Sequence, residues 1–150
     1  MPRLARFTGT KFITSSTPIG FGIRFSVDDD NSVYATISFD KSKEGGQGIV
    51  HGGAIAAVLD EAMGTAAGEN GTPGYTVTMT YNYKSHIPLN QEVMVRGWVE
   101  RVEGRKVFAA CEAKLLDGTI AVTGSGIFIQ SELLKKQLEE HPYTAPSENG

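Results

Sequence analysis

The segment from Gly48 to Gly68, GIVHGGAIAAVLDEAMGTAAG, constrains the fold of this chain more than any other. After its His-Gly-Gly turn, small and apolar residues dominate, and their spacing predicts a helix over 52–68. A surface helix normally keeps a polar outer face, which this one lacks, so it must be covered on both sides. Asp60 and Glu61 nevertheless lie in its middle, and buried acids without obvious structural partners are candidates for chemistry.

A helical wheel at about 100° per residue separates the two carboxylates. One arc is expected to face a sheet and consists of Ile55, Val58, Leu59, Ala62, Met63 and Ala66. The opposite arc consists of Gly53, Ala57, Asp60, Gly64 and Ala67. Asp60 lies among small residues, as expected where a ligand or another backbone approaches, whereas Glu61 lies to the side. We therefore favour Asp60 as the catalytic acid; the alternative is that it makes a hydrogen bond across a subunit interface.

The start of this helix is a second candidate site. Its first backbone N–H groups have no partner within the helix and carry the positive end of the dipole. Gly52 and Gly53 allow a carbonyl oxygen to approach these groups closely, which predicts an oxyanion-binding site. The alternative is that the paired glycines serve tight turn geometry. His51 either orients a substrate or stabilises the turn.

The spacing of these candidates bears on quaternary structure. Gly52 and Asp60 are eight residues apart, which is about 12 Å along a helix. One carbonyl carbon cannot lie within about 3 Å of both groups in the same chain. If both act on one substrate, Gly52 of one subunit must meet Asp60 of another. The sequence thus predicts a homodimer with shared sites.

The remaining pattern predicts an α+β fold. Strands are expected at 21–29 and 32–40 before the helix, and at 75–87, 91–102, 106–116 and 119–130 after it, with a short helix over 131–140 capped by Ser131. About six antiparallel strands then curl around one long helix. We expect a single domain over 1–150, with an N-terminal arm (1–20), a core (21–130) and a C-terminal helix and loose tail (131–150).

Composition excludes several classes of protein. A net charge of −3 and a pI near 5.6 argue against a nucleic-acid partner. Cys111 is the only cysteine and falls in a predicted strand, where we expect it to be buried and inert. No apolar run reaches the roughly 18 residues of a membrane span. The first 27 residues carry basic residues and no acid, so they are either a folded arm or an organelle-targeting remnant, and we expect a cytoplasmic or organelle-matrix location.

Three motifs carry a family resemblance: GIVHGGAIAAVLDEA, YNYKSHIP and VEGRKVFAAC. With Asp60 nine positions after His51, residues 20–130 resemble the hotdog-fold acyl-CoA thioesterases, in the branch of PaaI and thioesterase superfamily members four and five. The resemblance implies a curved sheet around a central helix, an acyl-CoA substrate, no metal or further cofactor, and a homodimer paired into a homotetramer. It implies that the Gly52 N–H polarises the thioester carbonyl, that Asp60 of the partner subunit activates water or attacks directly, that His51 supports the turn, and that Thr76 holds the water or the aspartate.

Substrate contacts are also expected from Gly53, Gln47 and Glu61. Because CoA carries phosphates, the mouth of the site should be basic, and the best candidates are Lys84, Arg105 and Lys106, with Arg101 weaker. The chain departs from the family pattern at Gly45, six positions before His51, where many relatives carry Asn or Gln. Gln47 is a possible substitute through a shifted loop.

The sequence bears on two other functions, of which the first stays open. A non-catalytic acyl-CoA or lipid-binding hotdog protein is favoured by Gly45 in place of the amide residue. A hotdog hydratase or dehydratase requires a different Asp/His pair, which the sequence does not contain.

Overall fold

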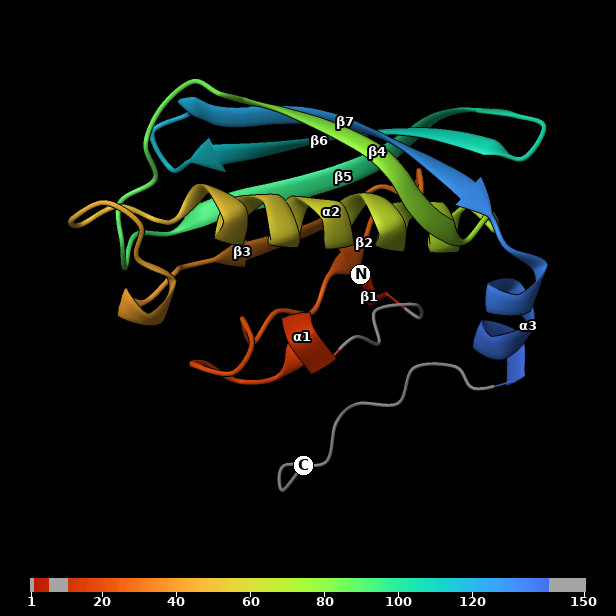
Figure 1. The fold of residues 1–150 in the computed structure, drawn as a ribbon, viewed down its shortest axis with the longest axis horizontal. Helices are drawn as coiled ribbons and strands as arrows, with labels where there is room; N and C mark the ends of the chain where they lie inside the picture. The colour runs from red at the N-terminus through yellow and green to blue at the C-terminus, as the bar shows by residue number, and fades with distance from the viewer. Residues whose placement is uncertain (1, 6–10, 141–150) are drawn as a thin grey trace.

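Helix α2 (Gly52–Glu69) is the central element of the fold, and the sheet curves over one side of it (Figure 1). The structure is a computed structural model that describes residues 2–5 and 11–140. The helix begins where it was predicted and ends one residue later than expected. Its C-cap is Asn70, and Gly71 follows with a φ of +80°, so Gly71 provides the left-handed turn that ends the helix.

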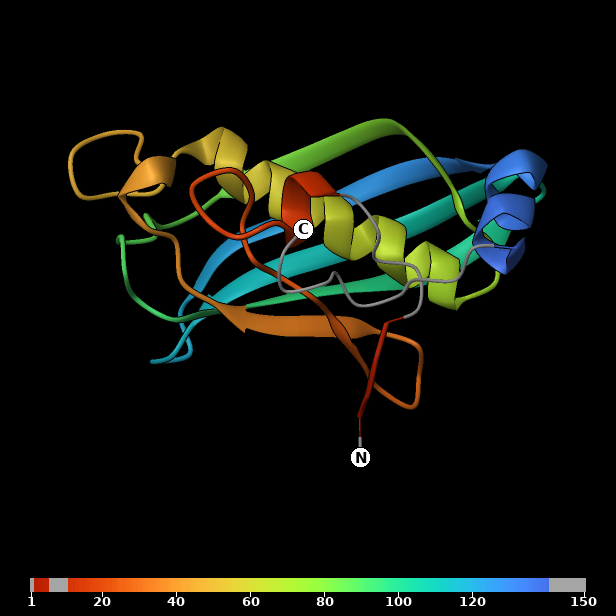
Figure 2. The ribbon, with the colours of Figure 1, turned by 90° about the horizontal axis from the view of Figure 1, so that it is seen from below.

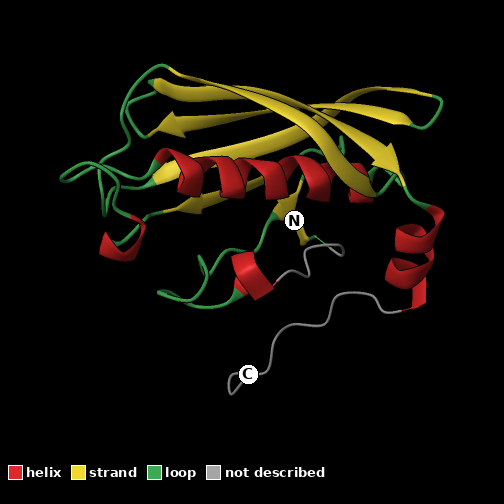
Figure 3. Cartoon of the chain, viewed as in Figure 1, coloured by secondary structure: helices red, strands yellow, loops and turns green. Residues whose placement is uncertain are grey.

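The strands form a curved layer over the central helix (Figure 3). The sheet is antiparallel, and the strands of the described residues follow the order β1-β2-β3-β5-β6-β7-β4. They are β1 (Arg3–Leu4), β2 (Ser26–Val27), β3 (Val33–Ile37), β4 (Gly74–Tyr83), β5 (Val93–Glu103), β6 (Lys106–Leu115) and β7 (Ile120–Gln130). The expected six strands become seven because the N-terminal arm adds β1 beside β2. Strand β4, which directly follows α2, forms the opposite edge of the sheet.

The predicted sheet-facing arc of α2 is confirmed, since all six of its residues are buried. The helix crosses the sheet at Gly97 of β5, where an added β-carbon would lie 2.6 Å from the backbone carbon and oxygen of Ala62. Only glycine allows the backbones of helix and strand to approach this closely. On the other arc, Ala67 is buried as well, while Gly53 stays exposed. The far side of the helix is therefore covered toward its C-terminal end and open toward its N-terminal end.

The N-terminal arm supplies part of that cover. Helix α1 (Lys11–Thr14) lies against the face of α2 that is turned away from the sheet (Figure 2). The strand predicted over 21–29 was wrong except for β2. The amides of Phe21 and Ile23 both donate to the Ile13 carbonyl, so this segment packs along the arm instead of the sheet, and Gly22 turns it with a φ of +64°.

Two further strands are shorter than predicted. Strand β3 stops at Ile37, and Asp40 then caps a 3-10 turn, η1 (Lys41–Lys43). Strand β4 stops at Tyr83, because the next two amides both donate to the Ala121 carbonyl and turn the chain away from the ladder. The remaining strands agree with the prediction within two residues at each end.

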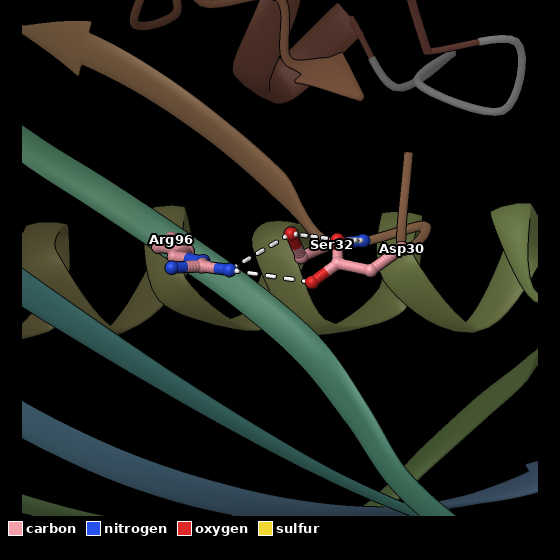
Figure 4. Close-up of polar contacts among 3 residues, drawn as sticks. All are labelled: Asp30, Ser32 and Arg96. Carbon is pink, nitrogen blue, oxygen red and sulfur yellow. Dashed lines mark hydrogen bonds and ion pairs between the residues drawn. The ribbon is translucent and has the colours of Figure 1, made fainter. Parts of the chain in front are cut away.

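The turn between β2 and β3 is fixed by a small polar cluster (Figure 4). The Asp30 carboxylate accepts from the backbone N–H of Ser32 at 2.9 Å and from its hydroxyl at 2.6 Å. Arg96 of β5 donates to the Ser32 hydroxyl at 3.1 Å and lies 3.6 Å from the Asp30 carboxylate. The Ser32 hydrogen bonds, and secondarily the charge of Arg96, lower the pKa of Asp30. The cluster therefore ties the first hairpin to the centre of the sheet.

The C-terminal helix α3 (Glu132–Glu140) begins as predicted, with the Ser131 hydroxyl accepting from the Leu134 amide at 3.0 Å. The tail predicted over 141–150 lies outside the described residues. Within the described part of the chain, no helix is both long and apolar enough to cross a bilayer. No three His, Cys, Asp or Glu side chains of that part are grouped as metal ligands would be.

Candidate active site

The His-Gly-Gly turn leaves one backbone donor free at the start of α2. His51 is the N-cap, and its Nδ1 accepts from the Gly53 N–H at 2.8 Å. The amides of Ala54 and Ile55 both donate to the His51 carbonyl. Among the described residues, the Gly52 N–H is therefore the first-turn donor without an acceptor.

Glycine occurs at positions 52 and 53 for two different structural reasons. A β-carbon on Gly53 would lie 3.0 Å from the imidazole of His51, so Gly53 lets the ring reach its capping position. A β-carbon on Gly52 would lie 3.6 Å from the Tyr83 ring, an ordinary contact. The chain itself therefore does not require glycine at 52, and the absence of a side chain keeps the free N–H accessible.

A cavity of about 800 Å³ opens beside this donor. Its walls come from the loop before α2, the helix start and the end of β4, and its lining includes Gly45, Ile49, His51, Gly52, Tyr83, Lys84 and His86. Because Nδ1 of His51 accepts a hydrogen bond in this geometry, the neutral imidazole carries its proton on Nε2. The cavity thus combines a backbone N–H, an imidazole and a lysine, a set that suits a ligand with a carbonyl and negative charge.

Asp60 lies two helical turns further along, and a neighbour on β4 holds it. The Thr76 hydroxyl donates to Oδ1 of Asp60 at 2.8 Å. Asp60 is half-buried, and this burial raises the pKa of its carboxyl, while the hydrogen bond from Thr76 lowers it in part. A carboxylate with raised pKa and one oxygen fixed is suited to accept a proton from water.

Two ionisable groups close to Asp60, Cys111 and Tyr81, stay uncharged. Cys111 of β6 is buried as predicted, and burial, together with the nearby charge of Asp60, raises the pKa of its thiol to about 12. Burial also raises the pKa of Tyr81, whose hydroxyl donates to the Ala56 carbonyl at 3.1 Å. Both groups therefore stay protonated and neutral at physiological pH, and Cys111 has no nucleophilic character.

The structure brings some of the predicted residues together and separates others. Lys84 lines the cavity at the helix start, whereas Gln47 is exposed and Glu61 is half-buried, and neither lines that cavity. Arg105 lines a separate cavity of about 510 Å³ at the other end of β4, and Lys106 is exposed at the start of β6, next to it. Within one chain, the proposed phosphate-binding residues therefore lie at opposite ends of the edge strand.

The structure gives a steric reason for Gly45. A β-carbon at this position would lie 2.8 Å from the Cα of His51, so any side chain here requires the backbone to shift. The Gly45 amide donates to the Ile49 carbonyl, which holds the loop tightly against the N-cap residue. In this conformation of the loop, Gln47 is exposed and does not line the cavity, so the expectation that it replaces the missing amide side chain finds no support.

Two cavity residues, Tyr83 and His86, were not singled out from the sequence. Both belong to the YNYKSHIP motif, and Tyr83 follows Tyr81 at the two-residue period of one strand face. This alternation places Tyr81 and Tyr83 on the same side of β4, although it does not show that this side meets the start of the helix.

Comparisons with known proteins identify the family of this chain. The profile described as thioesterase superfamily matches residues 47–122, about half of the chain. Mouse acyl-coenzyme A thioesterase THEM4 is 36% identical over 88 residues, which are 58% of this chain and 38% of that protein. Mouse acyl-coenzyme A thioesterase THEM5 is 31% identical over 98 residues, 65% of this chain and 40% of its own. The chain spans about two fifths to one half of the length of such curated relatives.

Solved structures show the same fold. A crystal structure of a thioesterase superfamily protein superimposes with a TM-score of 0.72 at 28% identity, covering 75% of this chain and 55% of that one. The PaaI protein of Escherichia coli, from the phenylacetic acid degradation operon, gives 0.68 at 14% identity over 74% and 80%. The antiparallel sheet around one helix is thus the hotdog fold of thioesterases. The chain belongs to the thioesterase superfamily.

A third structure is informative about ligands. It is a hypothetical thioesterase of Streptococcus pneumoniae with coenzyme A, with a TM-score of 0.64 at 17% identity, covering 67% of this chain and 81% of that one. Two further structures of that streptococcal protein carry an aspartate-to-alanine and a threonine-to-alanine substitution, sixteen positions apart in its chain.

The hydrogen bond from Thr76 gives a testable pH effect. In Thr76→Val the carboxyl of Asp60 loses the group that lowers its pKa, so if Asp60 acts as a base, the acid limb of the pH profile of the reaction moves to higher pH. The plateau rate falls about tenfold because the carboxylate is less well oriented. Initial rates between pH 4 and pH 9 measure both effects, with Thr36→Val, an exposed position on β3, as the matched control. An acid limb that stays in place contradicts the role of Thr76.

Proposed function

We propose that this protein hydrolyses acyl-CoA thioesters to the free acid and coenzyme A. The observation that carries the proposal is that α2 holds two reactive groups. One is the free N–H of Gly52, which lies beside a cavity, and the other is the half-buried carboxylate of Asp60, which Thr76 holds by a hydrogen bond. A hydrogen-bond donor that stabilises an oxyanion and a carboxylate that acts as a base are the two groups that acyl transfer to water requires. The streptococcal relative with coenzyme A supports this ligand class.

In the proposed reaction, the thioester oxygen accepts the Gly52 N–H, and Asp60 takes a proton from water as the new C–O bond forms. The tetrahedral intermediate then collapses, the C–S bond breaks, and Asp60 returns the proton to the departing thiolate. Direct attack by Asp60, through an acyl anhydride that water hydrolyses, is the alternative course. The imidazole of His51 holds the turn in either case and offers its Nε2–H to the substrate. The pair Asp60 and Thr76 are sixteen residues apart, as are the two substituted positions in the streptococcal protein.

The site requires a second copy of the chain. Asp60 does not line the cavity at Gly52, and about 12 Å of helix separates the two residues. Strand β4 is an edge strand with apolar side chains that are strongly exposed, namely Tyr75 at 56%, Val77 at 62%, Met79 at 44% and Tyr83 at 51%. An exposed apolar edge is a surface for pairing with another strand.

Antiparallel pairing of two β4 strands accounts for the shared site. If the two strands cross near Met79, Thr76 of one subunit lies near the partner subunit's Tyr83, whose hydroxyl bonds Gly52. Asp60 then faces the partner's helix start. The same pairing places Arg105 and Lys106 near the partner's Lys84, so that the three cations together can bind the phosphates of CoA. Further association of dimers into a tetramer completes the proposal.

A subunit-mixing experiment tests both the chemistry and the shared site. Gly52→Pro removes the donor, Asp60→Asn removes the base, and each variant alone is expected to be nearly inactive. Co-refolding the two at equal amounts produces half heterodimers, each with one intact site, so about a quarter of the wild-type activity returns. Mixing each variant with itself is the control. If activity does not return although mixed dimers form, the site lies within one subunit; if the wild type releases no CoA from any acyl-CoA of a broad panel, the hydrolase proposal fails.

A second function, acyl-CoA binding without turnover, is favoured by one observation, the absence of any side chain at Gly45. It predicts heat of binding for acyl-CoA in calorimetry and no CoA release. The hydrolase proposal predicts both binding and release.

A further inference from the structure

We propose that Tyr83 and Tyr81 are positioning residues for the two reacting groups on α2, a role that rests on the proposed hydrolase. Three hydroxyl side chains of edge strand β4 reach the helix. Tyr83 donates to the Gly52 carbonyl at 2.7 Å, Tyr81 donates to the Ala56 carbonyl at 3.1 Å, and Thr76 donates to the Asp60 carboxylate at 2.8 Å.

The three acceptors follow the helical repeat. Residues 52, 56 and 60 are four apart, so they lie in a row along one side of α2. The row begins at the residue that carries the free N–H and ends at Asp60, the proposed base. The hydroxyl ladder, defined here as Tyr83, Tyr81 and Thr76, therefore fixes β4 to α2 along the whole length of the site.

The row of donors depends on a β-bulge. Strict alternation would put Tyr83, Tyr81 and Met79 on one face of β4 and Thr76 on the other. The pairing of β4 with β7 shifts register between Thr76 and Thr78. This β-bulge turns the Thr76 side chain to the helix side, where Thr76 pairs with buried Phe128 of β7. The extra residue is what allows all three hydroxyls to face α2.

The hydroxyl ladder also gives a role to the hydroxyl groups of the two tyrosines, of which only Tyr81 packs its ring against the core. Tyr83 is about half exposed and Tyr81 is half-buried. Each hydroxyl nevertheless donates a hydrogen bond to a helix carbonyl that already accepts one from a backbone N–H of the helix. Such a second hydrogen bond to the same carbonyl adds little to the stability of the helix itself. It does fix the helix relative to the strand that is proposed to pair with the second subunit, so dimerisation and the Gly52-to-Asp60 geometry become coupled through β4.

Tyr83→Phe and Tyr81→Phe test the ladder, because each removes one hydroxyl and keeps the ring. We expect kcat to fall about tenfold with KM nearly unchanged, since misplacing a reacting group by a fraction of an ångström slows the chemical step. Hydrogen exchange measured by NMR supplies a readout independent of activity. In Tyr83→Phe, exchange should quicken roughly threefold or more at the Ala56 amide, which donates to the Gly52 carbonyl; in Tyr81→Phe the effect should move to the Asp60 amide.

Tyr34→Phe is the matched control, because Tyr34 lies on β3, which three strands separate from β4 in the sheet. It should change neither the rates nor the exchange of α2. Unchanged exchange at Ala56 and Asp60, an unchanged kcat, or an equal rise in exchange throughout the protein overturns the proposal. A wild type that hydrolyses no thioester overturns the proposed function instead, and local exchange changes would then support only the fixing of β4 to α2.

Discussion

Asp60→Asn is expected to abolish thioester hydrolysis and, at neutral pH, to make the protein more stable. The loss of the proposed base lowers kcat by about 100- to 10,000-fold. The gain in stability follows from the raised pKa of Asp60, because the folded protein must hold an ionised carboxylate in a partly desolvated position. Asparagine has the same shape, keeps an oxygen for the Thr76 hydroxyl and carries no charge.

The sign of the stability effect depends on pH. A carboxyl whose pKa is higher in the folded than in the unfolded state stabilises the fold below the unfolded pKa and loses that contribution as pH rises through the folded pKa. The difference in thermal midpoint between Asp60→Asn and wild type should therefore be positive at pH 7 and shrink as pH approaches the ordinary aspartate value of 3.8. Exposed Glu92→Gln is the matched control and should show neither effect. A variant that is less stable than wild type at pH 7 would indicate that Asp60 is a structural residue.

Gly52→Pro is expected to lower kcat about 100- to 1,000-fold while the helix stays intact. Proline removes the one N–H that the site is proposed to use, and it is well tolerated at the first position of a helix. The preceding residue already has a suitable backbone conformation, since His51 has a φ of −60° and a ψ of 132°. The loss should therefore appear in kcat without a large change in the circular dichroism or the thermal midpoint.

Gly52→Ala separates the donor from the space around it. Alanine keeps the N–H and adds a β-carbon at an ordinary 3.6 Å from the Tyr83 ring, so this variant should lose much less activity than Gly52→Pro. If the two variants are equally impaired, the space at residue 52 matters and the N–H does not.

The sequence by itself determined the central helix and singled out Gly52 and Asp60 on it as candidate site residues. An apolar pattern with a period of 3.6 residues predicts both the bounds of α2 and the arc that the sheet buries, because helical geometry converts spacing directly into direction. The long strands after the helix were predicted from apolar residues that alternate with a period of two, together with the turn residues between them. The strand over 21–29 was not, since Phe21 and Ile23 look like strand residues and only the nearby Ile13 carbonyl diverts them from the sheet.

The tertiary structure decided which groups meet. A register shift in β4 brings Thr76 under Asp60, the ring of His51 takes the Gly53 N–H and leaves that of Gly52 free, and the close approach of His51 excludes a side chain at Gly45. Lys84 and Arg105, both predicted at the basic mouth of the site, lie within one chain at opposite ends of the edge strand. Local periodicity fixes the direction of a side chain along one element, whereas the partner it meets depends on bulges, register and close contacts between elements that are far apart in the chain.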